Sequence, residues 1–288
     1  MRRFLSQSLL IGLIAGMAGL LAMIWSHPAR EAIMAGAAIG LIVLSLLLER
    51  AWPHDPAWAP VPRAELAGDI GGLILIFGLL DAALKWLTPF LVLALWPFDS
   101  GLALPLWQQA LLAVLWIEFA AWASHWAHHR YRPLWALHAM HHSTARLYTL
   151  NNFRFHPFNH ALNHLAMILP LLWIGIAVEA ILIYTALSLP VLLLQHANIG
   201  FDFGRLNLLF NTNDLHRWHH SARPGEGVMN LGRALVIWDR AFGTYLRPEP
   251  AKAPARIGLF QGDPFPPPAR FAAQLAWPFN PACCRSTG

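Results

Sequence analysis

Eight histidines form three short clusters whose residue type and spacing are those of metal ligands. The clusters are His125-x3-His129, His138-x2-His141-His142 and His216-x2-His219-His220. On a helix, side chains three or four residues apart lie on one face, so each cluster can direct two or three imidazoles toward a single point. One HxxxH pair arises often by chance. Three clusters in one chain, two of them with the form HxxHH, favour metal binding over a purely structural role.

A ninth histidine and the total number of imidazoles indicate more than one metal ion. His196 follows the last apolar segment, where the topology described below delivers it beside the three clusters. A structural zinc site takes four ligands and a catalytic zinc site three, so nine imidazoles fit two ions with four or five ligands each. Imidazole suits zinc, copper, iron and nickel, and ligand type therefore does not select the metal. The clusters contain neither the Glu-x-x-His pairs of carboxylate di-iron bundles nor the HExxH of zinc proteases.

Four further histidines lie near these clusters. His156, His160 and His164 follow one another at intervals of four residues at the start of an apolar segment. They are either additional ligands or a polar stripe at the level of the lipid headgroups, and we take His156 as an additional candidate ligand. His128 lies one position off the helix face of the first cluster, so we expect it to face solvent or to support a ligand from outside the metal site.

The elements that carry the clusters are expected to be membrane helices. Hydrophobic residues make up 57% of the 288-residue chain and charged residues only 12%, whereas a soluble domain carries about a quarter charged residues. Six apolar segments are candidates for crossing the roughly 30 Å hydrocarbon layer. They are Phe4–Trp25, Ala32–Leu48, Leu66–Trp96, Leu106–Ala123, Leu162–Ile176 and Glu179–Leu194. The last two are short and adjacent, so the sequence predicts about six spans, or four spans plus a shallow hairpin.

The distribution of Lys and Arg places the clusters on the cytoplasmic side. With the N-terminus inside, Arg30 and Lys85 are the only two of the 20 Lys and Arg residues outside the cytoplasmic segments, as the positive-inside rule requires. We therefore expect an all-α, polytopic integral membrane bundle with both termini and a helical, histidine-rich metal-binding cap in the cytoplasm. The pI near 9.8 follows from this topology, so nucleic-acid binding is not needed to explain it. The excess of Arg over Lys, with abundant Ala, Leu and Pro, is typical of a GC-rich bacterial genome and indicates the bacterial inner membrane.

Local signals place each cluster on a helix. Trp116–His129 contains no Pro or Gly, so the fourth apolar helix should continue past the membrane and carry the first cluster. Pro133 suits the first turn of a new helix that presents the second cluster, and the third cluster lies on a helix near Asp214–Ser221. We divide the chain into an N-terminal transmembrane hairpin with a cytoplasmic loop (1–65), a membrane catalytic domain (66–248) and a Pro-rich cytoplasmic tail (249–288).

Several segments between Glu118 and Leu246 resemble the motifs of the membrane fatty acid hydroxylase and sterol desaturase superfamily, whose members are histidine-rich di-iron oxygenases. The segments are His125-x3-His129, the stretch Leu134 to Ser143, Arg154-Phe155-His156-Pro157, Gln195-His196-Ala197-Asn198, the stretch His216 to Ser221 and the stretch Trp238 to Tyr245. Two positions depart from the family pattern. Glu118 stands where the family often has Asp, and Trp126 stands where it often has Arg.

The resemblance implies a set of iron ligands and a reaction. The implied ligands, which are also the catalytic residues, are His125, His129, His138, His141, His142, His196, His216, His219 and His220. The implied reaction is activation of O2 at two iron ions, followed by hydroxylation of an unactivated C–H bond of a lipid within the membrane. No flavin fingerprint, haem-attachment motif or ferredoxin cysteine set occurs in the sequence, so electrons must come from a separate donor of the ferredoxin or cytochrome type. The arginine-rich segment from Arg205 to Arg256 either steers an acidic donor or reflects only the positive-inside bias.

Three other functions stay open at the level of sequence. A lipid desaturase would use the same di-iron centre and remove a second hydrogen instead of returning hydroxyl. A haem-binding membrane electron-transfer protein would place isolated histidines on facing helices, and a zinc-dependent membrane hydrolase would activate water. The sequence selects neither the lipid nor the carbon that reacts.

Overall fold

The computed structural model describes residues 2–95, 101–247 and 252–283, and within these ranges the protein is helical. The longer helices are α1 (Arg2–Met23), α2 (Arg30–Ala51), α3 (Arg63–Gly72), the π-helix η2 (Leu73–Leu80), α4 (Asp81–Leu95), α5 (Leu106–Arg130), α7 (Pro157–Trp173) and α8 (Val178–Leu194). The short ones are η1 (Pro56–Trp58), α6 (Arg132–His138), η3 (Thr149–Phe153), η4 (Gly204–Leu208), α9 (Asn213–His219), α10 (Pro224–Gly227), α11 (Ile237–Phe242), α12 (Phe271–Ala276) and η5 (Trp277–Phe279). Extended pairing within the described ranges is limited to three isolated bridges. The expected all-α class is confirmed.

Four helical stretches are long and apolar enough to cross a membrane. They are α1, α2, the continuous stretch Arg63–Leu95 and α5. The helices α7 and α8 have 17 residues each, which is about 26 Å of helix at 1.5 Å per residue. The structure therefore has four candidate spans and, in α7 and α8, the shorter pair of helices that the sequence also indicated.

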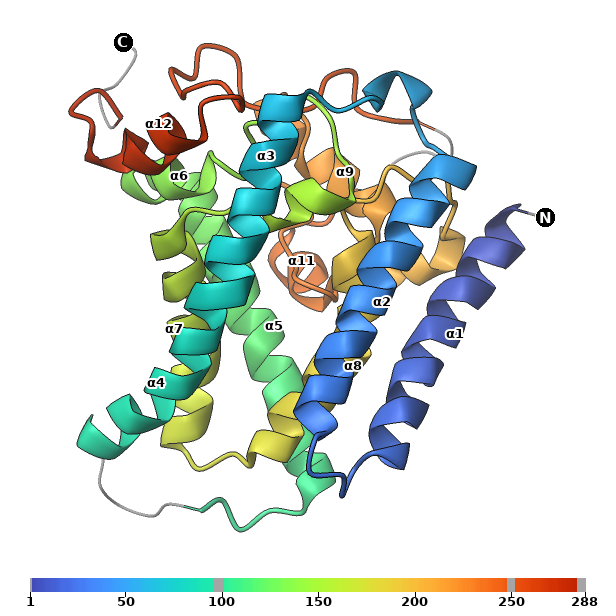
Figure 1. Ribbon diagram of the computed structural model, residues 1–288, viewed down its shortest axis with the longest axis vertical. Coiled ribbons are helices and arrows are strands. Elements are labelled where there is room, and N and C mark those ends of the chain that lie inside the picture. Colours follow the sequence, from blue (N-terminus) through green and yellow to red (C-terminus); the bar gives the residue numbers. More distant parts are fainter. Residues whose placement is uncertain (1, 96–100, 248–251, 284–288) are drawn as a thin grey trace.

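Helix α5 is the centre of the bundle, and both α7 and α8 pack on it. One core cluster joins α5, α7 and α8 through Ala113, Ile117, Leu171, Ala180 and Tyr184. Two of these residues are alanines without exposed surface, and such small side chains let helix backbones approach closely. Helix α8 also packs against α1 and α2 (Figure 1), so the N-terminal pair covers the far side of the same bundle.

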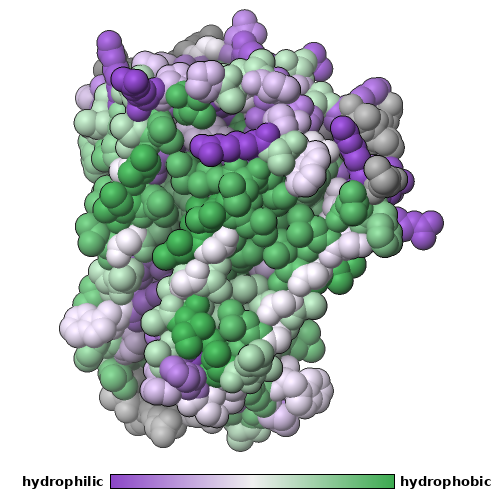
Figure 2. Space-filling view, turned by 45° about the vertical axis from the view of Figure 1, so that its right-hand side comes forward, coloured by the Kyte–Doolittle hydropathy of each residue, from purple (hydrophilic) through white to green (hydrophobic). Residues whose placement is uncertain are grey.

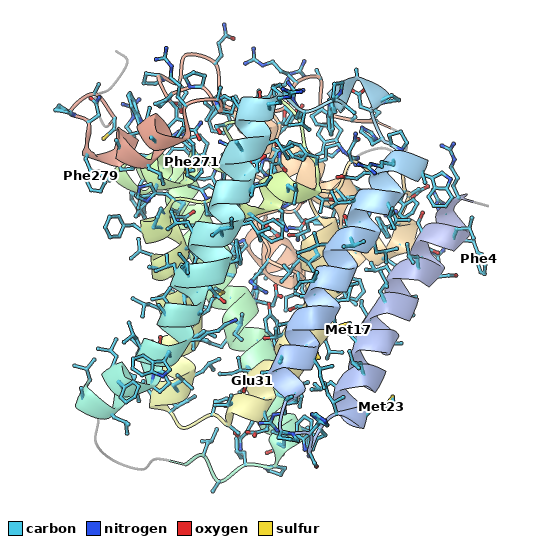
Figure 3. The ribbon with its side chains drawn as sticks, viewed as in Figure 1. Phe4, Met17, Met23, Glu31, Phe271 and Phe279 are labelled. Carbon is cyan, nitrogen blue, oxygen red and sulfur yellow. The ribbon has the colours of Figure 1, made fainter. Side chains whose placement is uncertain are left out.

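The outer surface of the helices is apolar, as a lipid-facing surface must be. Figure 2 shows a broad band of hydrophobic side chains across one face of the molecule and hydrophilic side chains gathered at one end. In α1, Phe4 points away from the bundle and is 72% exposed, whereas Met17 points inward and is 6% exposed (Figure 3). The four apolar spans and this surface identify an integral membrane protein.

The short helices α6, α9 and α12 lie together at one end of the bundle and form the cap (Figure 1). The N-terminal end of α1 lies at this same end, because Arg3 forms an ion pair of 2.8 Å with Asp202. The described part of the tail, residues 252–283, also packs on the cap. The Gly258 N–H donates to the His220 carbonyl at 2.9 Å, so the tail contacts the backbone of a candidate ligand.

Candidate metal centre

The structure brings the nine histidines that the sequence singled out into two adjacent groups. The five-histidine group contains His125, His129, His138, His142 and His219, and the four-histidine group contains His141, His196, His216 and His220. Within each group, one ring nitrogen of every residue lies within 4.8 Å of the others. The division into five and four imidazoles is the arrangement that two metal ions would need.

In each cluster, the two histidines that are four residues apart share one group, as the sequence predicted: His125 with His129, His138 with His142, and His216 with His220. The additional histidine of the second cluster, His141, and that of the third cluster, His219, each lie in the opposite group. Helix α6 ends at His138, so His141 and His142 lie in the turns after it and not on the helix itself. The reason is a tight turn in which the His141 N–H donates to the His138 carbonyl at 2.9 Å. This turn directs His141 to one group while His138 and His142 stay in the other.

The elements that hold the remaining ligands agree with the sequence expectation. Helix α5 continues to Arg130 and carries His125 and His129 on its last turns. The third cluster begins on α9 and ends just after it. His196 follows the end of α8 by two residues and is completely buried.

Oxygen acceptors around the site determine the tautomer of five of these histidines. The Nδ1 atoms of His125, His138, His141, His196 and His219 lie 2.8 to 3.3 Å from the oxygens of Leu231, Asn159, Arg154, Asn151 and Met229, respectively. A carbonyl or amide oxygen can only accept, so each of these Nδ1 atoms donates its hydrogen. Because a neutral imidazole has one N–H, the Nε2 atom of each ring carries a free lone pair.

The Nε2 atoms point at one another inside the groups. His125 and His138 approach to 3.0 Å through their Nε2 atoms, yet both rings have their hydrogen on Nδ1. No hydrogen lies between the two lone pairs, so only a cation placed between them makes this contact favourable. Metal–nitrogen bonds of about 2.1 Å put neighbouring ligand atoms about 3.0 Å apart at a 90° angle. The separations of three further pairs, His196–His216, His142–His219 and His216–His220, are 3.0, 3.1 and 3.2 Å.

Burial keeps the cap histidines neutral, as metal ligation requires. Burial lowers the pKa of His141 to about 3. Burial and the neighbouring imidazoles hold the pKa values of His216 and His220 well below the ordinary 6.5. Both ring nitrogens of His129 and the Nδ1 atoms of His216 and His220 are buried without a hydrogen-bond partner. Buried polar atoms without partners are rare in proteins, and those of His129 lie where a ligand atom is needed. The donor set therefore fits two transition-metal ions.

His128 does not face solvent, so that part of the expectation was wrong. It is 2% exposed, and its Nδ1 atom donates to the Ser124 carbonyl at 2.7 Å. Its Nε2 atom accepts from the Asn159 amide at 2.8 Å, and the oxygen of the same amide accepts from His138. The helix places the His128 ring against α7 instead of water, and the residue supports a ligand from outside the group.

The second row of histidines is not brought to the metal centre. Both ring nitrogens of His156 are engaged, since Nε2 lies 3.0 Å from the Leu275 carbonyl and Nδ1 accepts from the Phe158 N–H. His160 lies 3.2 Å from Asp81, and His164 lies 3.1 Å from Thr88. These contacts join α7 to α4 and to the tail, which is the role of a polar stripe.

Comparison with known proteins identifies the family of the chain. A family model described as fatty acid hydroxylase matches residues 110–244. Ornithine lipid hydroxylase OlsE from Rhizobium tropici is 32% identical over 260 residues, which cover 84% of this chain and 74% of that protein. The chain belongs to the fatty acid hydroxylase family. All nine histidines of the two groups lie within the residues matched by the family model.

Other relatives of this fatty acid hydroxylase family member match smaller parts of it. Alkylglycerol monooxygenase from Caenorhabditis elegans is 27% identical over 166 residues, covering 54% of this chain and 31% of that protein. Alkylglycerol monooxygenase from Danio rerio is 42% identical over 50 residues, covering 17% of this chain and 11% of that protein. No solved structure matches. Family and relatives agree on the reaction class, so the chain is an oxidoreductase of the monooxygenase type that acts on lipids.

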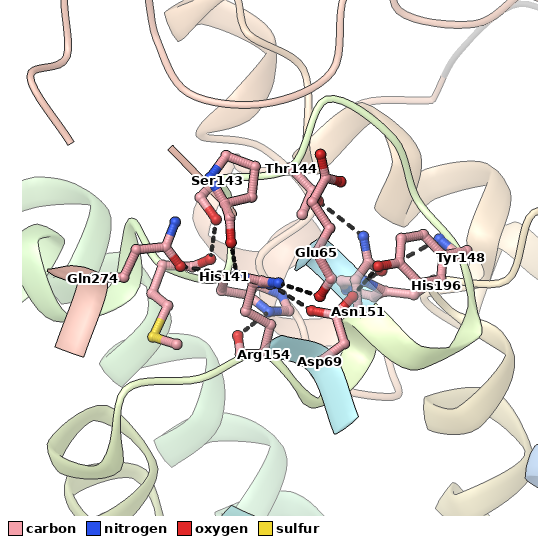
Figure 4. Close-up of polar contacts among 12 residues, drawn as sticks. Glu65, Asp69, His141, Ser143, Thr144, Tyr148, Asn151, Arg154, His196 and Gln274 are labelled. Carbon is pink, nitrogen blue, oxygen red and sulfur yellow. Dashed lines mark hydrogen bonds and ion pairs between the residues drawn. The ribbon is translucent and has the colours of Figure 1, made fainter. Parts of the chain in front are cut away.

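A buried ion pair supports the four-histidine group of this hydroxylase. Arg154 and Asp69 are both fully buried, and the Arg154 guanidinium also donates to the Gln274 side chain at 2.9 Å (Figure 4). Tyr148 donates its hydroxyl to the other oxygen of Asp69. The backbone oxygen of Arg154 in turn accepts from His141. The pair thus connects α3, the loop before α7 and the tail to one candidate ligand.

Sequence reasoning did not single out the amides that orient the ligands. Asn151 accepts from His196 at 2.8 Å, and Asn159 accepts from His138 at 3.1 Å. The signal for them was their place beside His156, in a polar stretch of an otherwise apolar chain.

The role of Glu118 was also missed, because the sequence showed this residue only as a departure from the family pattern. Its carboxylate accepts from Tyr184 at 2.7 Å and from the Leu235 N–H at 3.0 Å, so it ties α5 to the loop that carries the Leu231 carbonyl.

Proposed function

We propose that this protein hydroxylates an unactivated C–H bond of a membrane lipid with O2, at two iron ions held by the two histidine groups. The observation that carries the proposal is the contact between His125 and His138, whose Nε2 atoms meet at 3.0 Å with both hydrogens on Nδ1. Rings that have no hydrogen to share need a shared cation. Two such groups side by side suit a two-metal oxidant better than a hydrolytic zinc ion, which keeps few protein ligands.

Two bound iron ions would activate O2, which is the oxidant, and the protein supplies ligands, orientation and a dry environment. The overall balance is one C–H bond, one O2, two electrons and two protons giving one C–OH bond and one water. The five-histidine group would hold one ion and the four-histidine group the other. Asn159, Asn151 and the backbone oxygens keep the Nε2 lone pairs directed at the ions, and the buried ion pair of Arg154 holds the surrounding loops in place.

The position of the centre fits a lipid substrate. The first cluster ends the membrane helix α5, so the reacting groups stand at the junction between the apolar bundle and the cap. A lipid can reach this level by moving sideways in the bilayer, while electrons and protons arrive through the cap.

We infer that the protein lies in a bacterial inner membrane, with the cap and both termini on the cytoplasmic side, as the positive-inside pattern requires. Ornithine-containing lipids are the first substrates to test, because the relative that covers 84% of this chain bears the name of an ornithine lipid hydroxylase.

The deciding experiment combines lipid mass spectrometry with isotope labelling. Expression in a strain that contains ornithine lipids should add one oxygen to a lipid species, and that oxygen should carry label from 18O2 and not from H2 18O. Loss of two hydrogens without added oxygen would instead identify a desaturase. Label from water, or turnover without O2, would favour a hydrolase. Metal analysis of anaerobically purified protein should give about two iron ions per chain, and a Soret band would indicate haem instead.

A further inference from the structure

A surface pocket in the cap reaches the five-histidine group at the end of α5. Its volume is about 240 Å³, and its lining includes His129, Arg130, Arg132, Trp135, Phe260 and Asp263. His129 is a candidate ligand, so this pocket connects the outside of the protein with the metal centre. The ends of α5 and α6 form one wall of the pocket, and the tail forms the other.

An aromatic pair in the wall of the pocket contacts two of the candidate ligands. The Trp135 ring centroid lies 5.1 Å from that of His129 and 5.4 Å from that of His142. On its other side, Trp135 stacks on Phe260 with 5.2 Å between centroids and 11° between planes. The Trp135 indole N–H donates to the Asp263 carboxylate at 2.5 Å, which holds the ring in this orientation.

The charge at the mouth of the pocket is positive. Arg130 and Arg132 are both exposed, and both line the pocket. Asp263 also lines the pocket and accepts from the Trp135 indole and the Phe265 N–H, so two arginines and one carboxylate leave one net positive charge among these three side chains. Positive charge around the mouth of a pocket that leads to the five-histidine group attracts an acidic protein and speeds its association.

We propose that this pocket is the electron entry site, where an acidic one-electron carrier protein docks on Arg130 and Arg132 and passes electrons through the Phe260–Trp135 pair to the five-histidine group. The inference rests on the proposed function for the metal and names the surface that the donor uses. In each transfer the reduced carrier loses one electron and the metal pair gains one. Two transfers supply the two electrons of one hydroxylation, and the two protons come from water.

The docking part of the proposal is tested by binding, without turnover. A purified acidic [2Fe–2S] ferredoxin serves as the probe, and its affinity for the detergent-solubilised protein is measured at several salt concentrations. The double substitution Arg130→Glu and Arg132→Glu should weaken binding about tenfold and remove most of the salt dependence. Arg205→Glu is the comparison variant, because this exposed arginine in η4 begins the other arginine-rich segment that the sequence offered for steering an acidic donor. It should leave binding unchanged.

The transfer part is tested by stopped-flow reduction of the iron-loaded protein. Trp135→Leu should slow reduction by saturating ferredoxin several-fold, while ferredoxin affinity, iron content and reduction by dithionite stay as in the wild type. Trp135→Phe keeps an aromatic ring between Phe260 and His129 and should restore most of the rate. A residue that only fills space would change iron content or dithionite reduction along with the ferredoxin rate.

Several outcomes would overturn the inference. They are a ferredoxin that fails to bind the wild type, weaker binding in Arg205→Glu with normal binding in the double variant, and unchanged ferredoxin reduction in Trp135→Leu. These measurements are independent of the lipid reaction. If no lipid is hydroxylated but the binding and reduction effects occur as expected, the proposed function fails and the electron entry site stands.

Discussion

Asn159 accepts the Nδ1 hydrogen of His138, and this hydrogen bond decides which nitrogen of His138 faces the metal pocket. The distance is 3.1 Å, and the amide orientation is itself fixed because the Asn159 nitrogen donates to His128. His128 can accept only because its own hydrogen is given to the Ser124 carbonyl. One chain of hydrogen bonds thus runs from the backbone of α5 to a candidate ligand.

Replacement of Asn159 should weaken the five-histidine group. Asn159→Leu removes the acceptor of His138 and should reduce metal affinity about 10- to 100-fold, as is typical of changes behind a ligand. Asn159→Asp keeps an acceptor for His138 but cannot donate to His128, so its effect should be smaller. Competition with a chelator measures the affinities. Equal metal affinity in Asn159→Leu and the wild type would contradict the role given to this amide.

Each histidine group should lose metal independently when one ligand is removed. His141→Ala removes a ligand from the four-histidine group and His219→Ala one from the five-histidine group. Each variant should bind less metal than the wild type and lose hydroxylase activity, because a missing nitrogen opens the coordination sphere. The matched control is His27→Ala, which changes an exposed histidine between α1 and α2. Elemental analysis should find the control like the wild type, and full iron content in both ligand variants would refute the grouping.

Acid should unfold the metal-free protein earlier than a protein with ordinary histidines. The pKa of His141 is lowered by burial to about 3 in the folded state, against about 6.5 in an unfolded chain. Between these values the unfolded chain binds a proton that the folded chain does not, so stability falls as pH decreases. Each such group contributes about 1.4 kcal/mol per pH unit.

Thermal unfolding between pH 7 and pH 5 measures this effect. The melting temperature of the metal-free protein should decrease steadily over the range, and bound metal should oppose the decrease because it competes with protons for the same nitrogens. His27→Ala should show the same slope as the wild type. A melting temperature that rises on acidification would show that the histidines are not held neutral by burial.

The ion pair of Arg154 should be essential for folding of the cap. Arg154→Leu leaves Asp69 buried without its partner, and breaking one side of a buried pair costs about 3–5 kcal/mol. Arg154→Lys keeps the charge but cannot reach Asp69 and Gln274 at once, so an intermediate loss of stability is expected. The comparison variant Arg205→Lys changes an exposed arginine in η4 and should be neutral. The unfolding midpoints of the solubilised proteins measure these losses of stability. An Arg154→Leu variant as stable as the wild type would disprove the role given to the ion pair.

The residue types and their spacing were enough to predict that the protein is a helical membrane protein and that nine particular histidines come together. Apolar runs separated by polar segments can satisfy their backbone only as helices in a bilayer. Imidazoles at intervals of three and four residues are rare enough in combination to indicate candidate ligands. The extension of α5 to Arg130 also followed from local sequence, because the stretch Leu106–Arg130 contains no Pro or Gly.

Only the tertiary structure decided how the histidines are shared between the two groups and what holds them. Helical spacing already pairs the histidines four residues apart, but the placement of His141 after a turn and of His219 on α9 in the opposite groups depends on the segments packed around them. The orientation of the rings depends on Asn159, Asn151 and three backbone oxygens contributed by distant segments. These partners meet only when α5, α7 and the loops after α8 and α9 are packed together. Spacing along the chain can therefore nominate ligands, but their assignment to one ion or the other arises from long-range packing.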